Sequence, residues 1–475
     1  MALIWNGKFG GLADSKHSGI AGSFYRAVGV DGHSVPGTLT VRQKLTKESG
    51  STVDEFVKYA VATSDGHSFW FSADSGKIWR RSSAGVWLLV YTTSAAAGES
   101  KCLGAAEYNG YLYWATQSRL HRIAMADAHA TAANWTANAA PSWATFGVTN
   151  ASWHPMAIQD LTLFIGDGNQ VAEVNSSGTF SANVLDIKTP FQIKAMIPYE
   201  WDLLIGTTVT STVNHTEVIR WDTVSPSWNT SDPIEEVGIN AFIRDDNYVY
   251  VNAGRAGNLY FYNGEQLIPF KRIPGTYTKT AYGEIYPGSV ANFMGVPVFG
   301  FSNGTGNPAL EGIYSFGSYS RDYPKVLDLS WVISQAVTSA VEIGAVLVLD
   351  FDLVVAWKDS TGAAAYGVDA IDWSNKYASA YFETMMLFQD QRDIVKTLAN
   401  VSAFYNSLPA STGITFSYSI NGAAYVEMTS VTNSDLNEVR AQLSVGGVGS
   451  LQIKVAFTVS SNSAPVVEAI GVDME

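Results

Sequence analysis

The 475-residue chain has a single cysteine, Cys102, and charged residues make up only 15% of it. One cysteine excludes an intrachain disulfide and a cysteine-rich metal site, so packing must hold the fold together. Cys102 lies among small apolar residues, and we expect it to be buried rather than reactive. The net charge is -14, and Lys and Arg form no basic stripe. We therefore expect no sequence-specific binding of nucleic acid, which requires neutralising a phosphate backbone.

Long apolar runs and helical patterns are also scarce. No stretch is apolar for long enough to span a bilayer, and residues 1–8 lack the basic and apolar regions of a secretory signal. We therefore expect no membrane span, and synthesis in a cytoplasm. Gly, in contrast, numbers 42, Tyr 23 and Trp 14, a composition typical of turn-rich β structure. The chain is expected to be all-β and long enough for more than one domain.

A tight-turn signal followed by an apolar, aromatic-rich β pattern recurs seven times. The turns are predicted at Asp65-Gly66, Asn109-Gly110, Gln159-Asp160, Tyr199-Glu200, Asp246-Asn247, Met294-Gly295 and Phe351-Asp352. Neighbouring turns are 40 to 57 residues apart, close to the ~40 to 50 residues of a β-propeller blade. The pattern predicts a seven-bladed β-propeller over residues 51–374.

The second strand of each repeat is apolar on both faces, as in Phe69-Trp70-Phe71. Such strands are expected where one sheet lies between two others. The seventh repeat offers only three strands, at Ile343–Asp350, Leu353–Lys358 and Ala364–Asp372. We expect Thr38–Leu45 to supply the fourth strand, beside Ala364–Asp372, and so to close the ring.

The period is lost after residue 374, and longer strands follow. Asn421-Gly422 after Ile414–Ile420 is a strong hairpin signal. Further strands are expected at Ser379–Phe388, Val395–Phe404, Glu438–Val445 and Leu451–Val459. They predict a C-terminal β-sandwich over residues 375–475. Residues 1–50 are then an N-terminal arm that carries the ring-closing strand.

Candidate catalytic patterns have a more ordinary structural interpretation. Ser72-x-Asp74-x-Gly76-x-x-Trp79 resembles the Asp-box of sialidases, which is a structural turn in that family. Acidic residues near equivalent blade turns would suit a glycosidase that uses two carboxylates, but acidic residues are also ordinary turn formers. These residues are Asp160, Glu200, Asp245, Asp246 and Asp352.

Histidines and tryptophans are the other candidates for ligand binding. The histidines form no close pair, so a metal site would have to be assembled from different repeats. They are His17, His33, His67, His121, His129, His154 and His215. The tryptophans are expected to fill the space between blades. They are Trp70, Trp79, Trp87, Trp114, Trp143, Trp201, Trp221, Trp228 and Trp357. We predict no catalytic residues, no cofactor or cofactor-binding residues and no metal ligands.

Two short terminal patterns and the plan of the whole chain carry a resemblance to a known class of proteins. The patterns are the leader Phe9-Gly10-Gly11-Leu12 with Ser34-Val35-Pro36-Gly37, and the ending Leu451-Gln452-Ile453-Lys454-Val455 with Ser463-Ala464-Pro465-Val466-Val467. With a propeller between them, they resemble structural proteins of tailed bacteriophages. The resemblance implies a non-enzymatic protein of the virion tail, such as a nozzle, tube, adaptor or tip.

The partners implied are copies of the chain itself and other virion tail proteins. A β scaffold without disulfides and with few charged residues fits such an assembly. We expect the arm and the sandwich to carry most contacts between copies. The alternative is a glycan-binding or glycan-cleaving, sialidase-like propeller, whose partner is a host surface glycan.

Overall fold

The computed structural model describes residues 2–5, 10–13, 22–32, 34–35, 37–48, 52–93, 100–148, 150–209, 214–246, 248–275, 277, 283–303, 311–317, 325–335, 341–360, 364–387, 396–432 and 437–474. These residues are all-β apart from two short helices, α1 (Met125–Ala128) and α2 (Ala132–Asn138). Neither helix is long or apolar enough to cross a bilayer, and the described ranges hold no other helix. The chain divides into two compact units.

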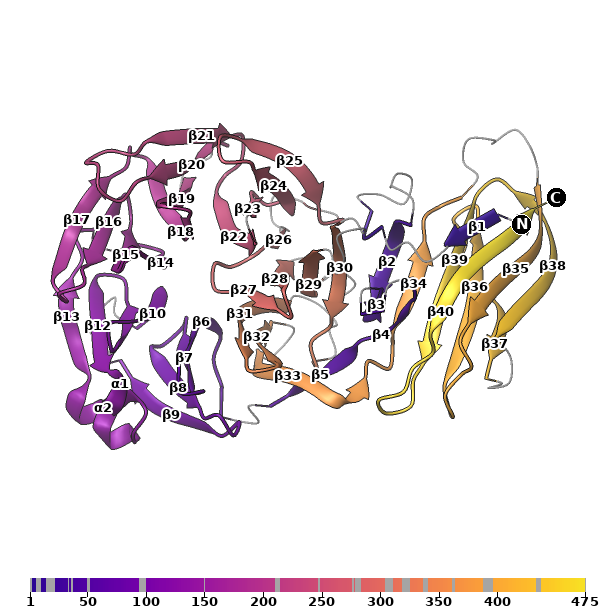
Figure 1. Ribbon diagram of the computed structural model, residues 1–475, viewed down its shortest axis with the longest axis horizontal. Helices are drawn as coiled ribbons and strands as arrows, with labels where there is room; N and C mark the ends of the chain where they lie inside the picture. The colour runs from indigo at the N-terminus through magenta and orange to yellow at the C-terminus, as the bar shows by residue number, and fades with distance from the viewer. Residues whose placement is uncertain are drawn as a thin grey trace. The chain divides into compact units, whose positions relative to one another are not determined.

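The first, called here the repeat unit, comprises Lys47–Glu311 and Gln335–Ala370. It contains five antiparallel sheets of four strands, each in chain order (Figure 1). They are β6 (Val57–Ala62), β7 (Ser68–Ser72), β8 (Lys77–Arg81) and β9 (Trp87–Thr92); β10 (Gly104–Tyr108), β11 (Tyr111–Ala115), β12 (Arg119–Ala124) and β13 (Ala140–Thr145); β14 (Met156–Gln159), β15 (Thr162–Asp167), β16 (Gln170–Val174) and β17 (Phe180–Asp186); β18 (Phe191–Tyr199), β19 (Asp202–Val209), β20 (Thr216–Trp221) and β21 (Thr230–Ile234); β22 (Ile239–Asp245), β23 (Tyr248–Ala253), β24 (Asn258–Tyr262) and β25 (Leu267–Arg272).

A sixth sheet of four strands joins the two ends of the repeats. Its order is β31 (Val341–Leu349), β32 (Asp352–Asp359), β33 (Ala365–Lys376) and β5 (Gln43–Lys47). The expected closing segment Thr38–Leu45 overlaps β5 only over its last three residues, so its predicted bounds were wrong. The upstream part forms β4 (Thr40–Val41), which instead pairs with β3 (Val30–Asp31). Val30 and Val41 are both fully buried, which explains why this short pairing competes for the segment.

The first strands of the repeats form a closed cycle of contacts. In order they are β6, β10, β14, β18, β22, β27 (Val290–Phe293) and β31, and β31 contacts β6 again. Buried apolar clusters fill the spaces between neighbouring sheets, and one of them joins Trp70 and Trp79 to Val354 and Val368 of the last sheet. Figure 1 shows these sheets arranged like the blades of a propeller, with the first strands innermost. The expectation of second strands buried on both faces is confirmed by β7, in which all five residues are buried.

The repeat unit also contains β26 (Gly283–Glu284) and β28 (Val296–Asn303). Strand β28 pairs with both β26 and β27. The turns that connect first and second strands confirm the repeat but correct its register. Two-residue loops are enclosed by the pairs Gln159 with Thr162, Tyr199 with Asp202, and Leu349 with Asp352. Three turns therefore lie one residue from their predicted positions, at Asp160-Leu161, Glu200-Trp201 and Asp350-Phe351. The predictions with a glycine at Asn109-Gly110 and Met294-Gly295 were right.

The other unit, the terminal unit, comprises Met1–Thr46, Gly312–Ser334 and Ile371–Glu475. One sheet has the order β1, β40, β35, β38, and another contains β29, β30, β2, β34, β39, β36 and β37. Their bounds are β1 (Ala2–Trp5), β2 (Phe24–Val28), β29 (Gly312–Gly317), β30 (Val326–Trp331), β34 (Tyr381–Thr384), β35 (Lys396–Tyr405), β36 (Gly413–Ile420), β37 (Val426–Val431), β38 (Glu438–Val448), β39 (Leu451–Thr458) and β40 (Val467–Met474).

The leader is therefore integrated into this unit rather than separate from it. Strand β1 pairs with β40, and β2 pairs with β34. Strands β29 and β30 also belong to the terminal unit. The predicted hairpin at Asn421-Gly422 is confirmed: both residues have positive φ, and β36 pairs with β37. Phe9, and most of residues 1–21, lie outside the described residues.

Candidate functional site

The turns between first and second strands all lie at one end of the repeat unit. Hydrogen bonds join neighbouring turns, from Tyr108 Oη to the carbonyl of Leu161 and from Gln159 Nε2 to the carbonyl of Glu200. Since consecutive strands are antiparallel, the turns between third and fourth strands lie at the same end. This end of the repeat unit is called here the tip face.

Large apolar side chains are exposed at four of these turns. The exposed fractions are 76% for Leu161, 80% for Trp201, 60% for Met294 and 76% for Phe351. Tyr248, at the start of β23, adds a fifth large side chain, which is about half exposed. Two-residue hairpin loops with positive φ aim their side chains away from the sheet, as at Leu161 and Met294. Large apolar side chains exposed at one end of a soluble protein are candidates for an interaction surface.

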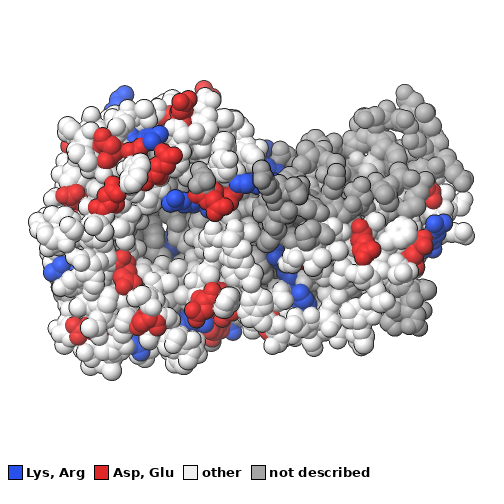
Figure 2. Space-filling view, in the orientation of Figure 1, with Lys and Arg blue, Asp and Glu red and all other residues white. Residues whose placement is uncertain are grey.

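A cavity of about 620 Å³ runs between the first strands. It is lined by small and apolar residues of these strands, and Figure 2 shows the surface of the repeat unit hollowed near its middle. Arg244, Asp246 and Asn292 contribute polar groups on the tip side, where β22 and β27 end. The cavity therefore connects the tip face with the beginnings of the first strands.

Charged side chains gather at the beginnings of the first strands, called here the polar end. Lys194 of β18 is almost fully buried, and its Nζ lies 2.8 Å from Asn240 Oδ1 and 3.1 Å from Glu284 Oε2. Asn240 in turn donates to Asn252 Oδ1 and to the carbonyl of Gly254. The ammonium group of Lys194 is thus bound by the carboxylate of Glu284 and the side-chain amide of Asn240. We interpret the Lys194–Glu284 ion pair as structural.

A second lysine at the polar end, Lys58 of β6, has a different environment. Its Nζ lies 4.0 Å from the centre of the Tyr286 ring. Burial lowers the pKa of Lys58, and the nearby carboxylates Glu342 and Glu284 partly oppose that shift. Glu342 itself accepts a hydrogen bond from Tyr286 Oη at 2.7 Å and pairs with Lys358 at 3.4 Å. Both glutamates therefore have partners: Glu284 pairs with Lys194, and Glu342 contacts Tyr286 and Lys358. They do not form a pair of free carboxylates that could act on a substrate.

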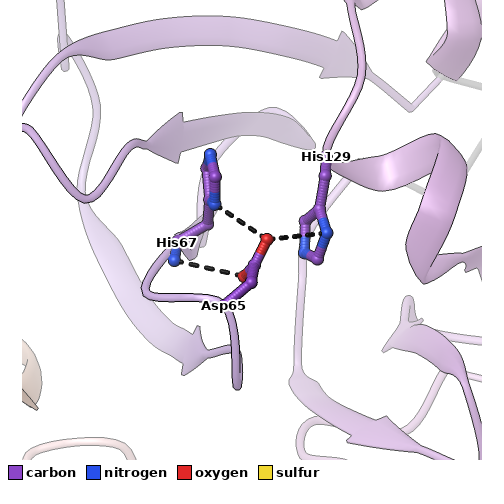
Figure 3. A group of neighbouring side chains, drawn as sticks. All are labelled: Asp65, His67 and His129. Carbon is purple, nitrogen blue, oxygen red and sulfur yellow. Dashed lines mark hydrogen bonds and ion pairs between the residues drawn. The ribbon is translucent and has the colours of Figure 1, made fainter.

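A third group of polar residues joins two sheets at the tip face (Figure 3). Asp65 and His67 belong to the β6–β7 turn, and His129 follows α1. Asp65 Oδ2 lies 2.9 Å from His67 Nδ1 and 2.8 Å from His129 Nδ1. The two imidazole rings stack with centroids 5.1 Å apart. Spacing along the chain gave no sign of this cluster, because His129 follows His67 by 62 residues.

Ionisation at the cluster is set by burial and by hydrogen bonds. Burial lowers the pKa of His129, and the nearby Asp65 carboxylate partly opposes that shift. For Asp65, burial alone would raise the pKa, but hydrogen bonds from Thr63 and the His67 amide and the nearby histidines lower it overall. Asp65 is therefore a carboxylate facing two imidazoles.

The other residues considered from the sequence have structural positions. Cys102 is buried as expected, and burial raises the pKa of its thiol to about 12. His121 lies in β12 and His154 in the segment before β14, both are buried, and burial lowers the pKa of each to about 4. The Asp-box-like turn is structural: Asp74 accepts a hydrogen bond from the Phe56 amide, and Trp79 is fully buried. His17 and His33 lie outside the described residues.

The acidic turn residues and the tryptophans divide between the core and the tip face. Asp160, Glu200 and Asp246 occupy turn positions with positive φ, Asp245 is buried at the end of β22, and Asp352 begins β32. Five tryptophans fill the core as expected, namely Trp70, Trp79, Trp114, Trp221 and Trp357. Trp201 was wrongly expected there, because the one-residue slip in its turn moves it from strand to tip.

No protein-family model matches the chain, and no curated protein matches it. Solved structures with a similar arrangement include a streptogramin B lyase, at 9% identity and a TM-score of 0.44, covering 69% of this chain and 97% of that one. The Dos1 propeller matches at 12% identity and a TM-score of 0.43, covering 69% and 94%. The extracellular domain of a protein described as a hybrid two-component system from B. thetaiotaomicron matches at 14% identity and a TM-score of 0.44. That match covers 78% of this chain but only 43% of the B. thetaiotaomicron chain.

Proposed function

We propose that the seven repeats, β6 to β33 together with β5, form a seven-bladed β-propeller and that the C-terminal strands form a β-sandwich. Support for seven blades comes from the closed cycle of first strands, β6, β10, β14, β18, β22, β27 and β31. Strands β27 to β30 then make the sixth blade, and β31, β32, β33 and β5 the seventh. Support for the sandwich comes from the two sheets of the terminal unit. Buried residues of both sheets are candidates for a core between them: Phe416 and Val455 in one sheet, and Val401 and Ile470 in the other.

We propose further that the chain is a non-enzymatic structural component of a virion tail that assembles with copies of itself. The observation that carries the assembly is the tip face, with Leu161, Trp201, Met294 and Phe351 exposed at equivalent turns. The assignment to a virion tail rests on the sequence resemblance of the leader and of the final strands to structural proteins of tailed bacteriophages. Partners in a tail are other virion proteins as well as further copies.

The exposed apolar side chains at the tips stand beside acidic turn residues, since Asp160 precedes Leu161, Glu200 precedes Trp201 and Asp350 precedes Phe351. Burial of apolar area is what stabilises a contact between copies made by this face, and it has to outweigh the repulsion between these carboxylates.

From the sequence, the arm and the sandwich were expected to carry most contacts between copies, but the exposed side chains of the tip face favour a different surface. The leader strands β1 and β2 already pair within the terminal unit. Among the described residues, the large apolar side chains exposed in the terminal unit are Val35, Trp373 and Val426, which are not at equivalent positions. We therefore place the main contact between copies on the propeller tips rather than on the arm and the sandwich.

Sedimentation velocity over a range of concentrations tests the assembly. The full chain is expected to form a closed oligomer, and the double variant Trp201→Ser/Phe351→Ser is expected to need at least about tenfold more protein to assemble, since buried aromatics dominate interface energies. Phe270→Ser is the matched control, because Phe270 is 43% exposed but lies on the outer strand β25. A chain that stays monomeric at high concentration, or a double variant that assembles like the control, would overturn the proposal.

A glycan-binding or glycan-cleaving propeller is the second candidate, favoured by the 620 Å³ cavity, whose lining includes the polar residues Arg244, Asp246 and Asn292. Incubating the full chain with sialosides and bacterial polysaccharides separates the two functions. Cleavage that is abolished by Asp245→Asn or Asp246→Asn would support the enzyme and contradict the structural assignment.

A further inference from the structure

We propose that Asp65, His67 and His129 form a binding site for a divalent transition-metal ion of the Zn²⁺ class. Each residue offers one ligand atom, and the three atoms all lie within 4.8 Å of one another. Two imidazole nitrogens and one carboxylate oxygen are a donor set suited to Zn²⁺ and its neighbours, whereas Ca²⁺ and Mg²⁺ prefer oxygen ligands alone.

The distances are close to those that a bound ion requires. Zn²⁺ binds nitrogen and carboxylate oxygen at about 2.0–2.2 Å, so neighbouring ligands of a tetrahedral ion lie about 3.3 Å apart. In the structure Asp65 Oδ2 is 2.8 and 2.9 Å from the two Nδ1 atoms. Figure 3 shows both rings directed at this one oxygen. A movement of about half an ångström by the exposed turn that carries Asp65 suffices to admit the ion.

Surrounding hydrogen bonds fix the ligands in this orientation. Asp65 Oδ1 accepts from Thr63 Oγ1 at 2.6 Å and from the His67 amide at 3.3 Å, which leaves Oδ2 facing the imidazoles. Arg80 donates to the carbonyls of His129 and Ala130 and so holds the loop after α1 against the β7–β8 sheet. Metal ligands in proteins are commonly oriented by such outer contacts.

The position of the site leaves room for a further ligand. The side chains of His67 and His129 are about a quarter exposed, and that of Asp65 is 37% exposed. Three protein ligands with an open side leave the fourth position of a tetrahedral ion to water or to an incoming group. Because the site joins the β6–β7 turn to the loop between α1 and α2, a bound ion would also cross-link two neighbouring sheets.

Calorimetric titration of the metal-free full chain with Zn²⁺ at pH 7.5 tests the proposal. One site per chain is expected, together with a rise in the thermal unfolding temperature, because an ion that binds only the folded state stabilises it. His129→Gln and His67→Gln are each expected to weaken Zn²⁺ binding at least about tenfold, and Asp65→Asn by a similar factor. His215→Gln is the control. His215 lies 3.4 Å from Glu217, but among the described residues no third potential ligand joins this pair, so the change should leave Zn²⁺ binding unaltered.

X-ray absorption spectroscopy of the Zn²⁺-loaded wild-type chain gives a readout that does not depend on how the variants fold. Two imidazole ligands and a light oxygen shell are expected around the ion. The proposal is overturned if the wild type binds no Zn²⁺, if His215→Gln lowers binding as much as His129→Gln, or if the spectrum lacks imidazole ligands. In each of those cases Asp65 only accepts hydrogen bonds from the two rings.

Discussion

The tip face and the polar end of the repeat unit lie at opposite ends of the same first strands and differ in chemistry. At the tip face large apolar side chains are exposed. At the polar end Lys194 and Asn240 are buried, and each polar group has a fixed partner. We infer that the polar end holds the sheets together, whereas the tip face is available for a partner. Substitutions at the two ends should therefore affect different properties.

The largest effect on stability is expected from Lys194→Met at the polar end. The change leaves Glu284 without its cation and Asn240 without its donor, and breaking a buried ion pair in this way costs about 3–5 kcal/mol. Urea unfolding followed by tryptophan fluorescence measures the change. Lys58→Met is the control and should cost less than about 1 kcal/mol, the size of its cation–π contact with Tyr286. Equal losses in both variants would contradict the assignment of Lys194 as the structural ion pair.

The next largest effect is a dependence of stability on pH, and it involves Asp167. This buried residue ends β15 at the polar end. Burial raises the pKa of Asp167 from 3.8 to about 6. The folded protein thus holds this proton more tightly than the unfolded chain, so its stabilising effect is complete below pH 3.8 and is lost as the pH rises to about 6. The shift corresponds to about 3 kcal/mol.

Asp167→Asn should remove this pH dependence, because an amide carries no charge at any of these pH values and can still accept the hydrogen bond from the Val148 amide. The free energy of unfolding of the wild type minus that of the variant, measured from pH 3.5 to 7.5, should fall as the pH rises. A difference that stays constant over this range would show that Asp167 does not titrate with a raised pKa.

A smaller loss is expected where the last sheet packs against the first. A Cβ added to Gly344 of β31 would lie 1.9 Å from the carbonyl oxygen of Val57 on β6. Gly344→Ala should therefore cost about 1–3 kcal/mol through overpacking at the ring closure. Gly446→Ala is the control, since its nearest contact would be 3.9 Å away. If both variants unfold at the same urea concentration, the close approach of β31 to β6 is wrong.

The smallest effect on stability is expected at the tip face. Trp201→Ser removes a side chain that is 80% exposed, so the free energy of unfolding should change by no more than about 0.5 kcal/mol. Chemical denaturation of dilute protein measures this value without interference from assembly. A loss of 2 kcal/mol or more would mean that Trp201 packs within its own chain and is not held for a partner.

The repeats could be predicted from the sequence because turn residues and doubly apolar strands are local signals. Glycine marked the turns at Asn109-Gly110 and Met294-Gly295, whereas the turns at Asp160-Leu161 and Glu200-Trp201 have no glycine and were misplaced by one residue. That slip hid the tip face, because a side chain in the turn points outward while its neighbour in the strand is buried.

Contacts between distant segments could not be predicted. The pairing of β1 with β40 joins the two ends of the chain, and no local pattern encodes it. Likewise, the sequence showed His67 and His129 only as isolated residues, and they meet because α1 and α2 interrupt the β12–β13 connection. Sequence patterns indicated which segments form strands, but not which distant side chains come together.

Radical footprinting of the full chain at low and high concentration tests the central claim most directly. If copies assemble through the tip face, oxidation of Trp201, Met294 and Phe351 should fall several-fold at high concentration, while oxidation of Tyr286 at the polar end stays unchanged. Protection of Tyr286, or of Trp373 and Val426 in the terminal unit, without protection of Trp201 and Phe351 would contradict the account.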